Sequence, residues 1–429
     1  MSLSYFEIVG GNRLRGNVRI GGAKNAALPI MAASILCDGE IILHDVPNVA
    51  DVNSLCELLR KLGVDADRRE DGALRLIVRD EMNCRAEYDI VRKMRASICV
   101  LGPLLGKRRK VQVSMPGGCA IGDRPVDLHL RAMEKLGAEV ELVSGDIVAK
   151  AKKLKGCEMF LGGPFGSTVL GTGNAMMAAT LAEGVTVIEM AACEPEVVDL
   201  ANFLNKCGAK ITGQGTPRIT VEGVKQLKGC EYRIIPDRIE AGTFMVAAAI
   251  TNGEIKIENC RLDHLMAFVD RLAAVGVSVE KTDFGCIVSS ARRLEPIEVT
   301  TQPFPGFPTD LQAQLMSLLC LADGNSIVTE KIFPDRFMHM PELNRMGARL
   351  RREGATVVVQ GVKKLVGAPV MASDLRASAA LVLAGLSARG VTKVNRIYHL
   401  LRGYERMEDK LRALGAEITR KEGGQAGDD

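Results

Sequence analysis

The sequence has almost no excess charge of either sign and no long apolar run. Its 429 residues include 56 lysines and arginines against 52 aspartates and glutamates, a formal net charge of +4. Such an even balance argues against a nucleic-acid binder or a protein held on a membrane by a basic surface. No apolar stretch reaches membrane-spanning length, and the N-terminus lacks the pattern of a signal peptide. We therefore expect neither a nucleic acid nor a membrane as partner.

Metal-ligand spacing is also missing. The twelve cysteines form no Cys-x-x-Cys pair and no cysteine–histidine cluster, which argues against both a zinc site and a disulfide framework. We expect most of them to be reduced core thiols of a cytoplasmic protein, and we predict no metal and no cofactor. The length and the 47% apolar content suit two domains, or one large domain, with an ample core.

What the sequence does contain is one pattern that occurs six times. Each copy has an amphipathic helix that ends at a glycine, where a helix C-cap needs a left-handed residue. Upstream lies a helix of small residues, as in 25–33, 175–179 and 377–384, and β-branched strands such as 185–188 follow. Repeated strand–helix–strand–helix–strand units predict an α/β repeat architecture rather than a single Rossmann sheet. The six glycines, spaced 68 to 74 residues apart, are Gly63, Gly137, Gly208, Gly276, Gly347 and Gly415.

One loop concentrates reactive side chains. Residues 116–127 follow a strand-like run, and their glycines and prolines exclude helix and strand. The loop carries a thiol at Cys119, a guanidinium at Arg124 and two carboxylates. Taken alone, it could equally be a surface turn with an incidental cysteine. The small-residue helices also begin with polar residues, as at 22–25 and 309–312. These either bind anions at helix N-termini or merely cap the helices.

Seven motifs together resemble those of the UDP-N-acetylglucosamine 1-carboxyvinyltransferases, the enolpyruvyl transferases that open peptidoglycan synthesis. The resemblance covers residues 6–418 and implies an α/β fold of two similar domains, each of three βαβαββ repeats (an inside-out α/β barrel), with the active site in the interdomain cleft. The phosphate-side catalytic domain would be discontinuous, residues 1–21 with 236–429, and residues 22–235 would carry the Cys119 loop. The motifs are residues 21–29, 94–97, 116–127, 236–240, 307–314, 374–378 and 402–406.

The resemblance also implies a reaction and roles in it. The enolpyruvyl group of phosphoenolpyruvate would move to the 3-hydroxyl of UDP-N-acetylglucosamine with release of phosphate, a step of cell wall biogenesis on which cell shape and division depend. Lys24, Arg124 and Arg402 match the cations that bind phosphoenolpyruvate. Cys119 matches the acid that protonates its vinyl carbon, which is also the target of fosfomycin, and Asp310 matches a candidate general base. The expected substrate-binding residues are Lys24, Asn25, Arg95, Arg124, Pro125, Val126, Asp127, Leu128, Ser167, Thr168, Val169, Asp310, Ile332, Arg376 and Arg402.

Two departures from the family pattern concern the acceptor. Residues 166–174 are arranged differently from the family's Ser-Val-Gly-Ala-Thr-Glu-Asn, and Cys193 stands where arginine is common. A sibling transferase that uses another nucleotide, or a shikimate-type acceptor, is therefore the main alternative. The Gly-Gly-Cys loop argues against shikimate 3-phosphate. A catalytically silent binding protein on the same fold is a further alternative, disfavoured by the intact reactive residues. The motifs indicate no oligomeric state.

Overall fold

The computed structural model describes residues 4–92, 94–115, 126–290 and 293–422. These residues divide into two compact units. We call the described residues between 22 and 235 the central unit, and those in 4–21 and 236–422 the terminal unit. The chain passes between the units at residues 21–22 and 235–236. Within the described ranges, no helix is long and apolar enough to cross a membrane.

The described residues form six four-stranded sheets, three in each unit, with one common plan. The first two neighbours in each strand order are parallel, and the other neighbours are antiparallel. The central unit contains β18 (Glu231–Arg233), β4 (Glu40–His44), β6 (Leu74–Val78) and β5 (Val64–Arg68); β7 (Arg85–Ala86), β8 (Lys110–Ser114), β10 (Asp146–Lys150) and β9 (Glu139–Val143); and β11 (Glu158–Phe160), β14 (Val185–Glu189), β16 (Arg218–Glu222) and β15 (Lys210–Thr212).

The terminal unit repeats this plan three times. Its sheets are β2 (Arg15–Arg19), β19 (Glu254–Glu258), β21 (Gly285–Ser289) and β20 (Ser278–Thr282); β22 (Glu298–Thr300), β23 (Asn325–Thr329), β25 (Thr356–Gln360) and β24 (Arg349–Glu353); and β26 (Pro369–Met371), β27 (Val391–Asn395), β1 (Tyr5–Val9) and β28 (Glu417–Lys421). Two short sheets, β12 (Gly162–Gly163) with β13 (Gly166–Ser167) and β3 (Cys37–Asp38) with β17 (Leu227–Lys228), complete the described strands.

In four copies a helix joins the two parallel strands, as a parallel pair requires a crossover connection. In the other two, the helix follows a strand of another sheet: residues 24–33 lead from β2 to β4, and residues 238–250 lead from β18 to β19. Three copies read βαβαββ along the chain and the other three assemble the same elements, which confirms the predicted repeat. Three copies are completed by strands distant in sequence, because β18, β2 and β1 each join a sheet whose other strands lie elsewhere in the chain.

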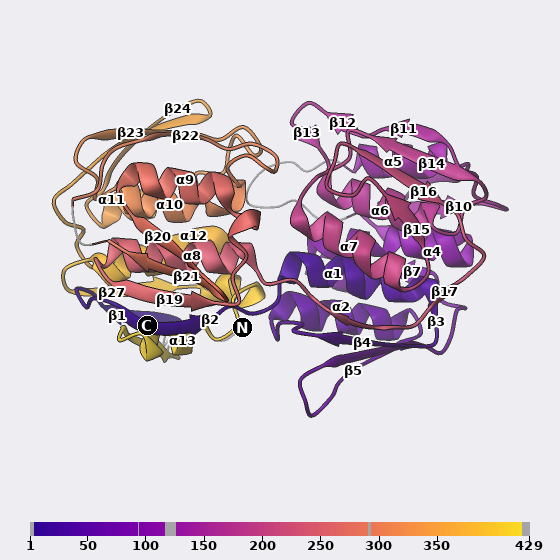
Figure 1. Ribbon diagram of the computed structural model, residues 1–429, viewed down its shortest axis with the longest axis horizontal. Helices are drawn as coiled ribbons and strands as arrows, with labels where there is room; N and C mark the ends of the chain where they lie inside the picture. Colours follow the sequence, from indigo (N-terminus) through magenta and orange to yellow (C-terminus); the bar gives the residue numbers. More distant parts are fainter. Residues whose placement is uncertain (1–3, 93, 116–125, 291–292, 423–429) are drawn as a thin grey trace, which may run out of the picture. The chain divides into compact units, whose positions relative to one another are not determined.

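The crossover helices form the interior of each unit, and the sheets lie outside them (Figure 1). They are mostly apolar, as buried helices are; in α8, every residue from Ile239 to Ile250 is buried. Small residues let them approach closely, since a Cβ atom on Gly242 would come within 2.5 Å of Leu311. The crossover helices are α1 (Lys24–Ala33), α4 (Leu101–Arg108), α6 (Val169–Ala179), α8 (Arg238–Ile250), α10 (Gln312–Leu319) and α12 (Leu375–Ser387).

The second helix of each copy ends at one of the six repeated glycines. All six glycines have left-handed backbones, with φ between +81° and +103°, and this confirms their predicted place at helix ends. These helices are α2 (Ala50–Lys61), α5 (Asp127–Lys135), α7 (Pro195–Lys206), α9 (Met266–Val275), α11 (Met340–Arg345) and α13 (Met407–Ala413). Four of the other described helical segments are α3 (Tyr88–Val91), η1 (Ser34–Leu36), η3 (Leu262–His264) and η5 (Ile397–Arg402).

Two of the small-residue helices begin differently from the expectation. The polar residues at 95 and 309 open 3₁₀ turns, η2 (Arg95–Val100) and η4 (Thr309–Leu311), that precede α4 and α10. Pro103 lies in the first turn of α4, which begins at Leu101 and where a proline costs no backbone hydrogen bond. The side-chain amide of Gln314 donates a hydrogen bond to the carbonyl oxygen of Asp310 in η4. In an α-helix, a backbone N–H would donate to that carbonyl instead.

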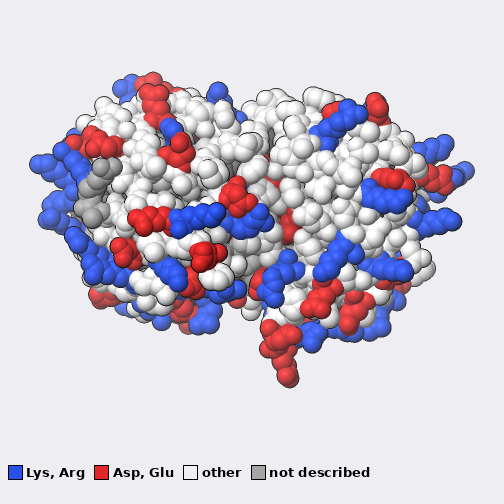
Figure 2. Space-filling model, viewed as in Figure 1, with Lys and Arg blue, Asp and Glu red and all other residues white. Residues whose placement is uncertain are grey.

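Charged side chains of both signs are intermingled over both units on the face shown in Figure 2. Many lie in surface pairs, such as Arg233 with Asp45 at 2.6 Å and Arg352 with Asp335 at 2.7 Å. The positive and negative charges of the sequence therefore largely neutralise one another in neighbouring surface pairs. That neither a nucleic acid nor a membrane is a partner stays a prediction.

Candidate active site

Asp310, the residue matched to the general base, lies between two arginines of the terminal unit. Arg336 Nη1 donates to Asp310 Oδ1 at 2.8 Å, and Arg376 donates to Oδ2 from Nη2 at 2.8 Å and from Nε at 3.2 Å. The Asp310 side chain is 27% exposed, but those of Arg336 and Arg376 are only 6% and 4% exposed. The carboxylate is therefore the open member of the cluster, and the two cations lie behind it.

The arginines determine the charge of this carboxylate. Burial would raise the pKa of Asp310, but the charges and hydrogen bonds of Arg376 and Arg336 outweigh burial and hold it well below its usual range. Each carboxylate oxygen accepts about two hydrogen bonds. Because Arg376 occupies Oδ2 twice and Arg336 occupies Oδ1 once, Oδ1 retains a free position among the described contacts. Asp310 can therefore accept a further hydrogen bond at Oδ1.

Arg376 is held in position by the capped first turn of α12 and by the ring of Tyr404. Asp374 caps the helix, because its Oδ1 accepts from the backbone N–H groups of Arg376 at 2.9 Å and Ala377 at 3.0 Å. The Arg376 guanidinium lies 5.4 Å from the ring centroid of buried Tyr404. The sequence predicted Arg376 as a substrate-binding residue, and the structure places it directly behind Asp310.

A buried carboxylate, Glu330, organises the segment after β23. Its Oε1 accepts from the backbone N–H groups of Ile332 at 2.8 Å and Phe333 at 3.0 Å, and from Thr301 Oγ1 at 2.6 Å. Its Oε2 accepts from Thr309 Oγ1 at 2.9 Å. Ile332, an expected nucleotide-sugar contact, is thus joined to the η4 turn that carries Asp310.

Arg402, the expected phosphoenolpyruvate ligand of the terminal unit, ends η5 and is half-buried. Segment η5 packs against α12. A Cβ atom on Gly403 would lie 2.7 Å from Leu375, so the backbone after Arg402 touches the first turn of α12. The structure therefore brings Arg402 to the helix end that also carries Arg376.

In the central unit, Lys24 begins α1 and pairs with a partner that the sequence did not indicate. Its Nζ lies 2.9 Å from Asp51 Oδ2 of α2, and both side chains are less than a tenth exposed. The pair fixes the position of the Lys24 ammonium. A bound anion would share this cation with Asp51.

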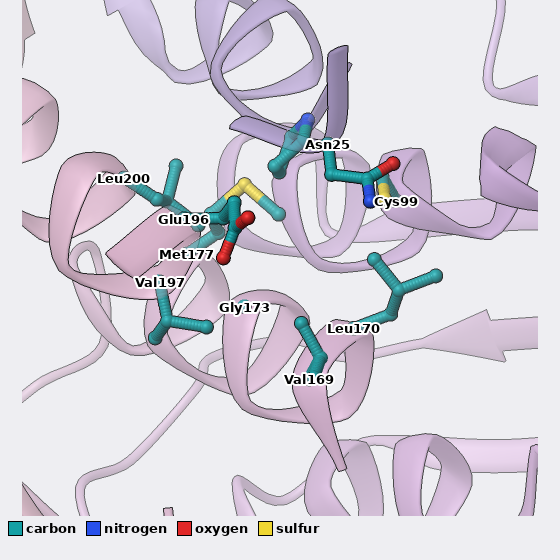
Figure 3. A pocket seen from close by; sticks show the side chains of 10 residues that line it. Asn25, Cys99, Val169, Leu170, Gly173, Met177, Glu196, Val197 and Leu200 are labelled. Atoms are coloured by element: carbon teal, nitrogen blue, oxygen red, sulfur yellow. The ribbon is translucent and has the colours of Figure 1, made fainter. Parts of the chain in front are cut away.

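Asn25 and Val169 line one small cavity, shown in Figure 3. Its volume is about 10 Å³, the lower limit for one water molecule. Asn25 and buried Glu196 carry polar groups in a lining that is otherwise mostly apolar. The residues are Asn25 and Pro29 of α1, Cys99 of η2, Val169, Leu170, Gly173 and Met177 of α6, and Glu196, Val197 and Leu200 of α7.

A buried amide joins three segments of the central unit that carry expected nucleotide-sugar contacts. Asn174 in α6 donates from Nδ2 to the Ile98 carbonyl and to His129 Nδ1, both at 2.9 Å, and its Oδ1 accepts from the Gly102 N–H at 2.8 Å. Burial, aided by the charge of Arg95, lowers the pKa of His129 to about 4, so His129 is neutral and can accept. The network ties η2, α5 and α6 together.

The segment that departs from the family pattern, residues 166–174, comprises β13 of the β12–β13 hairpin and the first residues of α6. Ser167 ends β13, and Thr168 caps α6 by accepting from the Gly171 N–H at 3.2 Å. The hairpin lies against α5, since a Cβ atom on Gly163 would be 3.3 Å from Leu128. The structure thus brings the expected contacts at 126–128 and 167–169 near one another. Val126 is buried, Leu128 is half-buried and Asp127 is exposed.

Three expected residues, Cys119, Arg124 and Pro125, lie outside the described residues, so their roles stay predictions. Sequence reasoning missed Asp51, Arg336 and Glu330. Glu330 and Arg336 were detectable in principle, because they lie two residues before and four residues after Ile332, an expected substrate contact. Asp51 carried no such signal.

Comparisons with known proteins place this geometry among enolpyruvyl transferases. A profile of the family described as EPSP synthase (3-phosphoshikimate 1-carboxyvinyltransferase) matches residues 8–411. A protein of Methylacidiphilum infernorum named UDP-N-acetylglucosamine 1-carboxyvinyltransferase is 51% identical over 418 residues, which covers 97% of this chain and 99% of the relative. A protein of Nitratidesulfovibrio vulgaris with the same name is 55% identical over 416 residues, covering 96% and 98%.

Two solved structures share the fold. The enolpyruvyl transferase NikO from Streptomyces tendae superposes with a TM-score of 0.89 at 24% identity, covering 99% of this chain and all of that chain. EPSP synthase from Acinetobacter baumannii gives 0.75 at 17% identity, covering 98% and 100%. At these identities the likeness shows the fold alone. It confirms the α/β enolpyruvyl transferase architecture that the motifs predicted.

Proposed function

The chain belongs to the UDP-N-acetylglucosamine 1-carboxyvinyltransferase family, and from this we propose that it transfers the enolpyruvyl group of phosphoenolpyruvate to the 3-hydroxyl of UDP-N-acetylglucosamine, releasing phosphate. The observation that carries the proposal is the identity of 51% and 55%, over nearly the whole chain, to relatives of that name. The reaction is the first committed step of peptidoglycan synthesis. A cytoplasmic location and roles in cell shape and division are part of the proposal.

The residues supply the groups that this chemistry needs. In the proposed mechanism, Cys119 gives a proton to the vinyl carbon, and the neighbouring carbon becomes electrophilic. The 3-hydroxyl oxygen bonds to that carbon while its proton passes to Asp310. The methyl group then returns a proton to the Cys119 thiolate, and the carbon–oxygen bond to phosphate breaks, which forms the enol ether of the product. Phosphate leaves with the proton held by Asp310, so both side chains regain their starting states. Lys24, Arg124 and Arg402 would hold the carboxylate and phosphate of phosphoenolpyruvate.

Asp310 suits its part in two respects. Its Oδ1 has room for one further hydrogen bond, and its side chain is the only member of its three-residue cluster with appreciable exposure. The two arginines keep it ionised, so it can accept from a hydroxyl throughout the working pH range.

A shikimate-type acceptor is not favoured, because the relatives at 51% and 55% identity carry the nucleotide-sugar name and the EPSP synthase structure is only 17% identical. The test measures phosphate released from phosphoenolpyruvate with UDP-N-acetylglucosamine and with shikimate 3-phosphate in parallel. We expect release with the nucleotide sugar alone. Release with shikimate 3-phosphate alone, or with neither acceptor, would refute the proposal.

A further inference from the structure

Glu330 lies outside every set of residues matched to the family's reaction, yet it is the most completely bonded carboxylate near Asp310. Its side chain is fully buried, and four neutral donors bind it. An ionised carboxylate buried without such bonds would cost several kcal/mol. Glu330 avoids this cost through four hydrogen bonds, and their concentration next to the η4 turn calls for an explanation.

A chain of three hydrogen bonds connects Glu330 to Asp310 through Thr309 and Arg336, and the donor of each bond is fixed. A carboxylate accepts but does not donate, so Thr309 must point its single O–H at Glu330 Oε2. The Thr309 oxygen then offers its lone pairs to Arg336, whose Nη1 donates to it at 2.9 Å. The second N–H of the same nitrogen donates to Asp310 Oδ1 at 2.8 Å. Oδ1 is the oxygen with room for a substrate hydroxyl.

We infer that Glu330 is a positioning residue that acts through Thr309 and Arg336 to orient the Asp310 carboxylate toward the acceptor hydroxyl. The inference rests on the proposed function for the identity of that hydroxyl. The chain of contacts itself rests only on the terminal unit. Glu330 also anchors the backbone of Ile332, so one buried charge sets both the base and an expected acceptor contact.

The chain offers a matched pair of threonines for the test. Thr301 and Thr309 each donate a hydroxyl proton to Glu330, and each accepts one N–H, from the Lys331 backbone at 2.9 Å and from Arg336 respectively. Only Thr309 lies between Glu330 and Asp310. Without the Thr301 hydroxyl, Oε1 keeps two backbone donors; without the Thr309 hydroxyl, Oε2 keeps none among the described contacts.

The kinetic test compares Thr309→Val with Thr301→Val in phosphate release. A lost hydrogen bond to a charged group corresponds to about a tenfold change, so Thr309→Val should lower kcat about tenfold with both KM values nearly unchanged. Thr309→Ser keeps the hydroxyl and should recover most of the loss. Glu330→Gln should resemble Thr309→Val, since its amide would donate to Thr309 and compete with Arg336. Thr301→Val should keep a kcat near that of the wild type.

A second measurement needs no turnover. Melting temperatures are taken for Thr309→Val, Asp310→Asn and the double variant, and for the same cycle built with Thr301→Val. Linked residues give non-additive shifts, and unlinked ones give additive shifts. We expect non-additivity only in the Thr309 cycle. Equal kcat values for the two valine variants, or additive shifts in both cycles, would overturn the inference. If the wild-type enzyme released no phosphate with UDP-N-acetylglucosamine but the melting-temperature shifts were still non-additive in the Thr309 cycle, the proposed acceptor would be wrong and the positioning role would stand.

Discussion

Replacement of Asp310 by asparagine tests the candidate general base with the smallest change of shape. The amide keeps one acceptor oxygen but puts an NH₂ group where the other carboxylate oxygen was. If the oxygen keeps both hydrogen bonds from Arg376, the NH₂ group faces Arg336 Nη1, a donor. In either orientation, the amide cannot take a proton at neutral pH, and two buried cations lose their counter-charge.

Two magnitudes follow from these contacts. Loss of a general base lowers kcat by about 10²–10⁴, while binding of the nucleotide sugar should weaken only modestly. Removal of one partner from a buried ion pair costs about 3–5 kcal/mol. Here we expect about 1–3 kcal/mol of unfolding free energy, because Asp310 is 27% exposed and the amide retains a hydrogen bond.

Asp335→Asn provides the control. Asp335 pairs with Arg352 at 2.7 Å, but its side chain is 75% exposed. The same chemical change there should alter the unfolding free energy by about 0.5 kcal/mol or less and leave kcat unchanged.

The assay is phosphate release together with urea unfolding at several pH values. The folded pKa of Asp310 is depressed, so its contribution to stability is present above its unfolded pKa of about 3.9 and is lost as the pH falls through the folded pKa. The stability gap between wild type and Asp310→Asn should therefore be full at neutral pH and shrink below pH ~4. Near-normal turnover in Asp310→Asn would place the base elsewhere and leave Asp310 as a ligand of its two arginines only.

Three further predictions concern other residues. Cys119→Ala should lose most turnover and Cys119→Asp should keep part of it, and mass spectrometry should find fosfomycin on Cys119; an adduct on another cysteine would contradict that role. Arg402→Ala should raise the KM for phosphoenolpyruvate sharply without changing the calorimetric affinity for UDP-N-acetylglucosamine, and Arg402→Lys should rescue it in part. The pKa of His129 is lowered to about 4, mainly by burial, so wild-type stability should fall as the pH drops from about 6.5 toward 4. His129→Gln, which cannot titrate, should show a weaker decline in urea unfolding.

The repeat was predictable because its signals are local. A left-handed glycine such as Gly63 or Gly276 ends its helix whatever the rest of the chain does. Small-residue runs such as those in α8 and α12 indicate burial by composition alone. No local signal indicated which distant strands complete the sheets. Strand β18 joins β4 across nearly two hundred residues, and only the family motifs suggested that the termini of the chain share a domain.

The site was predictable only where a motif covered it. Asp310 and Arg376 each lie in a recognised motif, but their pairing spans 66 residues, and that of Asp310 with Arg336 spans 26. Spacing in the sequence carries no information about such contacts. Asp51 was missed for the same reason, since its partner Lys24 lies 27 residues away. So were the contacts of Glu330 with Thr301 and Thr309, which lie 29 and 21 residues away.

In the proposed mechanism, the two arginines also constrain the step at which Asp310 takes the proton. A carboxyl group whose pKa lies well below its usual range is a weak base, and removing a proton from a free sugar hydroxyl is strongly uphill for it. The hydroxyl becomes acidic only as its oxygen bonds to the electrophilic carbon, because the oxygen then acquires positive charge. Proton transfer to Asp310 must therefore accompany or follow that bond rather than precede it. A late transfer requires the carboxylate to be correctly placed more than it requires strong basicity, and placement is what Arg336, Arg376 and buried Glu330 provide.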